Sequence, residues 1–390
     1  MKNEISPRER VILALNHTNT DRVPVDFLAT TEVWKKVIEY LNIEFQTQFA
    51  SDYFDPNWEA VLRKYKVDCR VLSYDQFFQP PESFFKPGDK INWWDSLSRS
   101  TPNRMFRRIS EDGIFHDLWG HPMRIVENPT GAYEEIIQFP LRDATPNDIK
   151  NYPWPDVDWW NIDQVGEAIA ELDAEEPYHL RFRAGSIFEV AWQLTGMDKF
   201  LMDLALDPKV PLLIMDYLTD ITAEVLNRVL SEYSERLDMV YFYDDVATEN
   251  SLMISKSMWG QFIQPRHKRL FDVAKKYQKK IMYHCDGSIY PLIPELIEMG
   301  VDLLNPIQVD AKNMEASRLK EEFGKKLCFH GAIDNIHTLP FGTPEDVQNE
   351  VKERIKILGK KGGYIVASTH HIQSNTPVEN VDAMYAVDIR

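Results

Sequence analysis

Residues 280–307 read KIMYHCDGSIYPLIPELIEMGVDLLNPI, and this stretch decides the predicted fold. It contains two β-rich runs, 280–286 and 301–307, on either side of a helical stretch that ends at Gly300. A helix between two strands brings the strands together in parallel. We therefore expect a parallel sheet that is covered by helices.

The same alternation of short β-rich runs and longer helical stretches extends over most of the chain. Eight such runs begin at Arg22, Cys69, Tyr178, Asp238, Lys280, Val301, Leu327 and Tyr364. Eight strand–helix units predict a closed (β/α)8 TIM barrel, formed by residues 1–390 as a single domain. A doubly wound open sheet is the alternative fold, but the chain has no GxGxxG phosphate loop.

A long segment separates the second run from the third. It contains short alternating segments, many tryptophans and the turn signal Asp112-Gly113. These features predict a β-hairpin-rich insertion, residues 76–160, between the second and third barrel strands. We expect the insertion to fold over the barrel mouth, with its tryptophans either packing against the barrel or lining a pocket.

Composition excludes several classes of protein. The chain of 390 residues carries 44 basic and 61 acidic residues, a formal net charge of -17, which disfavours nucleic-acid and anionic-lipid partners. No apolar run approaches the roughly 18 to 20 residues of a membrane span, and the charged N-terminus predicts a cytoplasmic protein. The three cysteines lie far apart, so a metal site must use His, Asp or Glu.

The run at 280–286 ends with two polar side chains on one face of the strand. Side chains alternate along a strand, so His284 and Asp286 point one way and Cys285 points the other way, towards the helices. The pair lies at the carboxyl end of its strand, where barrel enzymes carry their active sites. Two interpretations stay open, a metal or catalytic pair and a buried hydrogen-bonded pair.

Two adjacent histidines, His370 and His371, follow the last strand. One of them can complete a three-ligand metal site with His284 and Asp286, while the other packs or contacts solvent. The sequence leaves open which of the two points inward. After the seventh strand, Asp334 is a better candidate for the mouth than the strand residue His330.

The fourth strand ends in Tyr243, Asp244 and Asp245. Paired carboxylates at a strand end can orient a substrate or exchange a proton, and like charges side by side raise the pKa of one of them. Asp245 shares a strand face with Tyr243. The alternative is that both aspartates only cap the following helix.

Polar residues also follow the third strand. Ser186 and Glu189 fit a capping box, which is the alternative to a ligand role for Glu189. Arg183 is placed to hold a carboxylate or phosphate with two hydrogen bonds, or else to pair with an acidic neighbour. The chain has no GxSxG, P-loop, HExxH or EF-hand motif, so it offers no support for those classes of enzyme.

Several segments together resemble the uroporphyrinogen decarboxylase superfamily, in particular its corrinoid-dependent methyltransferase branch. They are SPRERVILALNHTNTDRVPVDF, GSIFEVAWQLTGMDKFLMDL, YDDVATENSLMISKSMWGQFIQPRHKRL, MYHCDGSIYPLIPELIEMGVDLLNPIQ, FHGAIDNIHTLPFGTPEDV and GGYIVASTHHIQSNTPVENVDAMYA. The resemblance implies a (β/α)8 barrel with its site at the C-terminal mouth. The decarboxylases carry an arginine-rich segment after the first strand, which LATTEVW replaces here, so uroporphyrinogen decarboxylation is not expected.

The resemblance also implies a zinc site. The methyltransferase relatives hold zinc with a His-x-Cys pair and a distant cysteine, and these positions correspond to His284, Asp286 and His370, with Glu189 as a fourth candidate. The branch implies a cobalamin carried by a partner corrinoid protein. We expect Asp334 and Gln308 to contact that cofactor.

The replacement of sulfur ligands by Asp and His implies a harder site, which suits an oxygen-bearing methyl donor. The expected reaction moves a methyl group from a small, preferably O-methylated, donor to the corrinoid protein, and relatives include homodimers. Two other functions stay open. One is a cofactor-independent decarboxylase or lyase of a small carboxylated substrate, and the other is a barrel that only binds ligands or partners.

Overall fold

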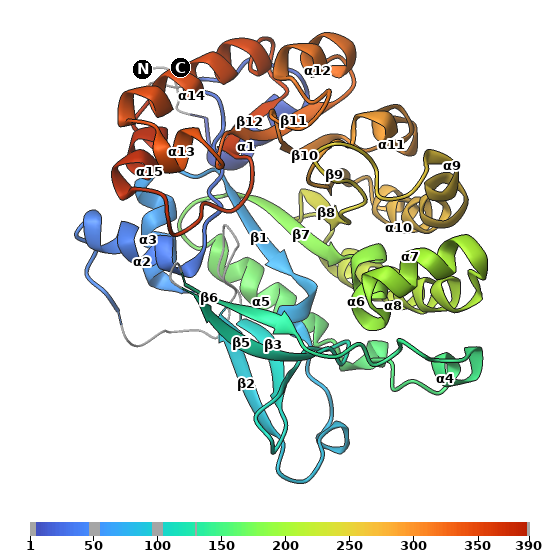
Figure 1. Cartoon of the computed structure of the whole chain (residues 1–390). Coiled ribbons are helices and arrows are strands. Elements are labelled where there is room, and N and C mark those ends of the chain that lie inside the picture. The colour runs from blue at the N-terminus through green and yellow to red at the C-terminus, as the bar shows by residue number, and fades with distance from the viewer. Residues whose placement is uncertain (1–4, 47–54, 96–103, 129–130, 388–390) are drawn as a thin grey trace.

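The computed structural model describes residues 5–46, 55–95, 104–128 and 131–387, and a curled parallel sheet dominates it (Figure 1). The sheet order is β1-β7-β8-β9-β10-β11-β12. The strands are β1 (Cys69–Ser73), β7 (His179–Gly185), β8 (Met239–Tyr243), β9 (Lys280–His284), β10 (Leu303–Ile307), β11 (Cys328–Ile333) and β12 (Tyr364–Ser368). All seven belong to runs that the sequence predicts as barrel strands.

The eighth predicted run, at 22–29, closes the barrel without forming a regular strand. Val25 forms a parallel bridge with Val366 of β12, and its carbonyl oxygen accepts a hydrogen bond of 3.0 Å from the Asp68 amide beside β1. The segment therefore lies between the two edges of the sheet. Pro24 has no amide hydrogen to donate, so the pairing there is irregular. The predicted (β/α)8 fold is confirmed.

Helices cover the outside of the barrel. They are α2 (Thr31–Tyr40), α3 (Pro56–Lys64), α5 (Ile162–Leu172), α6 (Phe188–Thr195), α7 (Met197–Leu206), α8 (Lys209–Tyr233), α9 (Lys256–Met258), α10 (Gln264–Lys276), α11 (Ile293–Met299), α12 (Ala316–Phe323), α13 (Thr338–Phe341), α14 (Pro344–Leu358) and α15 (Val378–Tyr385), with the π-helical turn η4 (Trp259–Ile263) and the 3-10 turn η5 (Tyr290–Leu292). The longest, α8, packs against α10, as Figure 1 shows at the right of the barrel. Among the described residues, no helix is both long and apolar enough to cross a membrane.

The first helix, α1 (Pro7–Leu15), forms the floor of the barrel. Ser6 caps it by accepting a hydrogen bond from the Glu9 amide. Val11 and Leu15 pack with apolar side chains from the first inward layer of the strands. That layer consists of Cys69, Met239, Met282, Leu303, Cys328 and Ile365. Water is therefore excluded from the barrel interior at this end.

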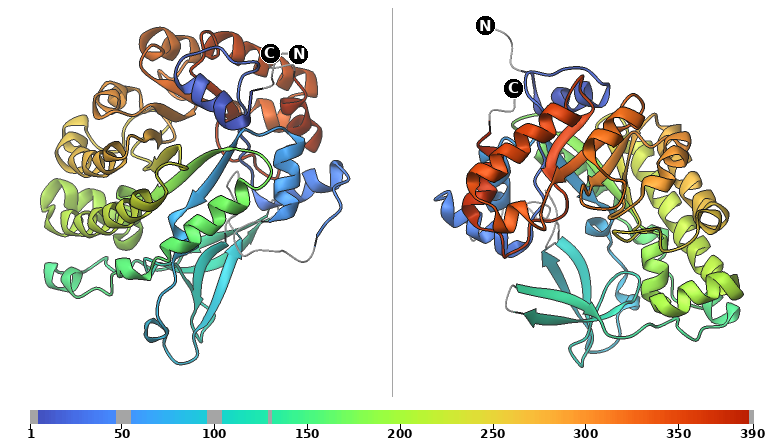
Figure 2. Two further views of the ribbon diagram at one scale, coloured as in Figure 1. Left: turned by 180° about the vertical axis from the view of Figure 1, so that it is seen from behind. Right: turned by 45° about the horizontal axis from the view of Figure 1, so that its top comes forward.

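A second sheet, of five antiparallel strands, lies between β1 and β7 along the chain (Figure 2). Its strands are β2 (Lys90–Asp95), β3 (Arg104–Ile109), β4 (Phe115–His116), β5 (Pro122–Asn128) and β6 (Gly131–Ile136), flanked by η1 (Tyr74–Phe77), η2 (Glu82–Phe84), α4 (Pro146–Lys150) and η3 (Val157–Trp159). Phe106 of β3 contacts Phe78 next to η1, with ring centroids 5.0 Å apart. Since η1 follows the carboxyl end of β1, this sheet begins on the mouth side of the barrel.

Candidate functional site

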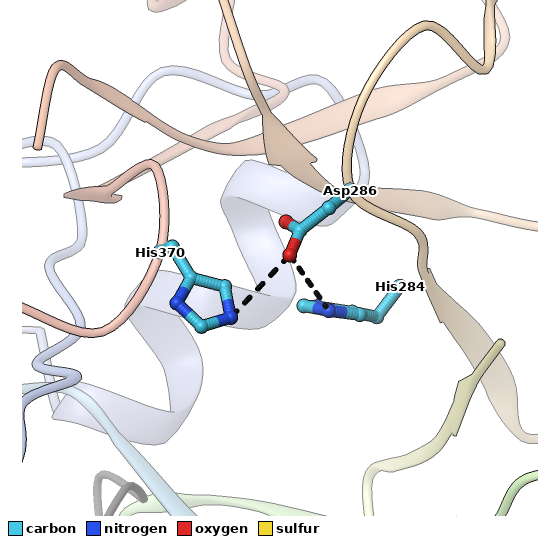
Figure 3. Close-up of side chains that lie close together, drawn as sticks. All are labelled: His284, Asp286 and His370. Atoms are coloured by element: carbon cyan, nitrogen blue, oxygen red, sulfur yellow. Dashed lines mark ion pairs between the residues drawn. The ribbon is translucent and has the colours of Figure 1, made fainter. Parts of the chain in front are cut away.

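Three predicted side chains meet at the carboxyl ends of β9 and β12 (Figure 3). His284 is the last residue of β9, Asp286 follows two residues later, and His370 follows β12. The Asp286 Oδ2 atom lies 3.4 Å from His370 Nε2 and 4.0 Å from His284 Nε2. The three half-buried side chains therefore aim one ligand atom each at a common point.

The loop after β9 has a backbone conformation that depends on a glycine at position 287. Cys285 is fully buried among apolar side chains on the helix side, as strand alternation predicts. Gly287 has φ +82°, and a Cβ atom there would lie 2.5 Å from the carbonyl oxygen of Thr248. Its amide donates to Gln308 Oε1 at 2.8 Å. This turn holds Asp286 over the barrel mouth.

These residues fit a metal ion. In this part of the chain, the ligand atoms of His284, Asp286 and His370 all lie within 4.8 Å of one another. The second carboxylate oxygen of Asp286 is buried and makes no hydrogen bond with any described residue. Burial lowers the pKa of His370, which keeps its imidazole in the neutral form that binds metals. Two imidazoles and one carboxylate form the donor set of a catalytic zinc site with an open position.

The structure separates the two adjacent histidines. His370 supplies Nε2 to the cluster, whereas His371 does not belong to it. The His371 ring packs edge-on against His370, with ring centroids 4.6 Å apart. Of the two, His370 is therefore the inward one, a choice that the sequence leaves open.

Glu189 and Asp245 support the cluster from one side. The Glu189 carboxylate accepts a hydrogen bond of 2.9 Å from the Asp245 amide, and the Asp245 carboxylate accepts one of 2.7 Å from the Asp286 amide. Burial, followed by the charges of Asp245 and Asp244, raises the pKa of Glu189. Glu189 is not in the group of three ligands found among the described residues. In this structure the Glu189 carboxylate instead holds the Asp245 backbone.

The Asp244 side chain forms hydrogen bonds within the protein. Its carboxylate accepts hydrogen bonds from the Ser186 hydroxyl and from the amides of Ile187, Phe188 and Glu189, at the start of α6. His267 Nε2 lies 2.6 Å from the same carboxylate. Asp244 is 1% exposed. The capping alternative thus describes Asp244 best, although the capped helix precedes β8 and does not follow it.

Arg183 and Tyr243 lie side by side inside the barrel. The Arg183 guanidinium stacks over the Tyr243 ring at 3.8 Å from its centroid and lies 3.8 Å from an Asp75 carboxylate oxygen. Burial lowers the pKa of Arg183, but the nearby Tyr243 and Asp75 outweigh this effect. The pKa of Arg183 is therefore raised above its ordinary value. This pair brings a cation and an aromatic face to the barrel interior.

A pocket of about 410 Å³ opens beside the cluster. Asp286, His370 and Gln308 line it, together with Ala247, Thr248, Glu249, Gly287, Asn335, Ile336, Thr369 and Gln373. Asp334 does not line it. The Asp334 carboxylate instead accepts hydrogen bonds from the amides of Ile336 and His337 before α13.

Sequence reasoning missed two buried polar residues, Asn305 and Asp26, and ranked a third, His330, below Asp334. His284 Nδ1 lies 2.6 Å from Asn305 Oδ1, and His330 and Asp26 continue the contact inward. Strand alternation would have identified Asn305 as it identified His284. Asn305 comes two residues after the inward-pointing Leu303 of β10, so its side chain also points into the barrel.

A sequence profile described as "Uroporphyrinogen decarboxylase (URO-D)" matches residues 130–387, about two thirds of the chain. The chain belongs to the uroporphyrinogen decarboxylase family. The predicted superfamily resemblance is thereby confirmed, and this family member also resembles two methyltransferases.

The "Methylated-thiol--coenzyme M methyltransferase" of Methanosarcina mazei is 24% identical over 238 residues, and the match spans 59% of each protein. A solved structure, "methyltransferase from Methanosarcina mazei", superposes on this family member with a TM-score of 0.60 and 18% identity, covering 98% of both chains. The second match shows a shared fold over the whole chain, including the barrel.

Proposed function

We propose that this family member is a methyltransferase that moves a methyl group from a small methylated donor to a corrinoid protein. The observation that carries the proposal is the convergence of His284, Asp286 and His370 at the mouth of the barrel. Membership of the family and the likeness to two methyltransferases support the class of reaction. The acceptor corrinoid is carried by a partner protein that docks at the mouth.

Zinc is the metal that we propose for this cluster, with His284, Asp286 and His370 as its ligands. When bound, zinc supplies a Lewis acid that polarises the atom bearing the methyl group. The chain itself keeps the ligands in place, since Asp245 holds the Asp286 backbone and Glu189 holds the Asp245 backbone. Glu189 thus enters the proposal as a support.

The donor set favours an O-methyl compound. Imidazole and carboxylate ligands make a harder site than thiolates do, and a hard site prefers oxygen to sulfur. In the reaction the methyl carbon bonds to the Co(I) corrinoid, and the C–O bond breaks with its electron pair on oxygen. The donor then takes up a proton and leaves as an alcohol.

The rest of the mouth contributes to binding in this proposal. Gln308 lines the 410 Å³ pocket and is proposed to contact the corrinoid. Asp334 lies outside that pocket and would act through the turn before α13. Arg183, stacked on Tyr243, is placed to pair with an anionic group of the donor.

The adjacent histidines provide a matched test. We expect His370→Ala to lower bound zinc below one equivalent and to reduce methyl transfer to Co(I) cobalamin at least ~100-fold, because a ligand is lost. His371→Ala, its neighbour outside the cluster, should keep both. Metal analysis and a spectroscopic assay with methoxylated, methylthio and methylamino compounds measure these effects. Equal activity of the two variants would contradict the proposal.

A lyase is the second candidate, because Arg183 and the protonatable Glu189 both lie near the mouth. Such an enzyme would convert a small carboxylated substrate without a partner protein. Incubation with candidate acids in the absence of any corrinoid separates the two functions, since turnover there supports the lyase and its absence supports the methyltransferase.

A further inference from the structure

A continuous line of hydrogen bonds runs from the cluster into the barrel. His284 Nδ1 lies 2.6 Å from Asn305 Oδ1, and Asn305 Nδ2 lies 2.6 Å from His330 Nδ1. His330 Nε2 lies 2.9 Å from Asp26 Oδ2, which also accepts a hydrogen bond of 2.6 Å from Arg181. Each of the four residues beyond His284 is at most 2% exposed. Water therefore does not compete for these contacts.

The chemistry of Arg181 fixes the direction of every bond in this line. A guanidinium only donates, so the Asp26 carboxylate accepts, and His330 must donate its Nε2 hydrogen to the same carboxylate. Burial lowers the pKa of His330, so its ring is neutral and its Nδ1 carries a lone pair. The donor and acceptor of each hydrogen bond are thus assigned from Arg181 as far as His330.

The same logic continues to the cluster. The His330 Nδ1 lone pair requires a donor, so the Asn305 amide turns its NH2 group towards His330 and its oxygen towards His284. The Asn305 oxygen can only accept a hydrogen bond, so the neutral His284 ring must carry its hydrogen on Nδ1. Nε2 of the neutral ring is then left with a lone pair, 3.9 Å from Asp245 Oδ1 and 4.0 Å from Asp286 Oδ2. The opposite orientation of Asn305 would set its oxygen against the His330 lone pair.

We propose that Arg181, Asp26, His330 and Asn305 form a positioning relay that fixes His284 in the Nδ1–H tautomer and so presents its Nε2 lone pair to a metal ion. The inference rests on the metal part of the proposed function. None of the four residues touches the metal position, so they are positioning residues. Partners of this kind around metal-binding histidines typically change metal affinity 10- to 100-fold, on the order of the effect expected here.

The relay joins parts of the barrel that are distant in sequence. Asn305 lies on β10, which pairs with β9, and His330 lies on β11, which pairs with β10. Asp26 belongs to the closing segment 22–29. Arg181 on β7 completes the line from the other side of β1. Barrel closure and the tautomer of one proposed ligand are therefore coupled.

Metal affinity tests the relay without any assay of activity. We expect Asn305→Ala to weaken Co²⁺ and Zn²⁺ binding by about 10- to 100-fold in competition with a chromophoric chelator. Asn305→Asp keeps an oxygen for the His284 Nδ1 hydrogen, and its second oxygen can accept a hydrogen bond from His330 once that ring is protonated on Nδ1, so this variant should restore most of the affinity. His179→Asn removes a buried histidine of β7, outside the relay, and should bind both metals as the wild type does.

The outcomes separate the relay from the proposed function. Unchanged affinity in Asn305→Ala overturns the relay, while the metal site stands if His284→Ala still loses metal. Unchanged affinity in His284→Ala overturns the metal site itself. A loss of affinity in Asn305→Asp as large as in Asn305→Ala would also overturn the relay, because the acceptor oxygen is then not what matters.

The tautomer is measurable directly on the wild-type protein, and variants are needed only to assign the signals. Nitrogen-15 spectra of histidine-labelled, chelator-treated protein distinguish Nδ1–H from Nε2–H rings, and His284→Gln and His330→Gln assign the two signals. We expect Nδ1–H for His284 and Nε2–H for His330. An Nε2–H signal for His284 would overturn the proposal.

Discussion

At the scale of the residue, Gly287 shows how one missing side chain shapes the site. The backbone there has φ +82°, and the Thr248 carbonyl oxygen occupies the space of a Cβ atom. The Gly287 amide donates a hydrogen bond to Gln308, and the residue before Gly287 is the proposed ligand Asp286. A substitution at Gly287 therefore moves the ligand as well as the turn.

Gly113 is a matched control for this residue. It has φ +79° with open space around it, so Gly113→Ala should cost only the backbone strain, about 1 kcal/mol of unfolding free energy. Gly287→Ala adds a steric clash, and we expect a cost of about 3 kcal/mol together with weaker metal binding. Urea unfolding midpoints and chelator competition measure both. Similar behaviour of the two variants would show that the clash is relieved locally.

At the scale of the element, Asp244 joins two neighbouring units of the barrel. It stands after β8 but caps α6, which follows β7, and His267 of α10 contacts the same carboxylate. Three helix amides and a hydroxyl depend on this one side chain. The position of Glu189 in the first turn of α6 is thereby fixed relative to Asp245.

Asp244→Ala should therefore destabilise the protein by about 3 kcal/mol, because several buried donors lose their acceptor. Asp198 is a suitable control, since it lies in the first turn of α7 and forms an exposed pair with Arg142. Asp198→Ala should cost less than about 1 kcal/mol. Urea unfolding compares the two variants, and an equal loss would mean that α6 finds another cap.

At the scale of the whole molecule, the buried pair of Asp26 and Arg181 ties the closing segment to the sheet. Burial alone raises the pKa of Asp26, but the charge of Arg181 and the hydrogen bond from His330 lower it on balance. The folded pKa is thus below the unfolded value of about 3.9. This contribution to stability is present above about pH 4 and is lost as the pH falls below it.

Asp26→Asn tests this linkage. We expect the variant to be less stable by about 3 to 5 kcal/mol at neutral pH, because Arg181 remains buried without a countercharge. Between pH 5 and pH 3 the wild type should lose more unfolding free energy than the variant, since only the wild type takes up a proton at this position. Urea unfolding over this pH range measures the difference, and parallel curves would contradict the assignment.

The sequence by itself determined the strands of the barrel and the side to which their residues point. Alternation along 280–286 places His284 inward and Cys285 outward, because strand geometry is local and repeats every two residues. The choice of His370 over His371 as the neighbour of His284, the cap that Asp244 provides and the link from Asn305 to Asp26 were decided only by the tertiary structure. These contacts join segments from 21 to 304 positions apart, and only the closed sheet brings such segments together.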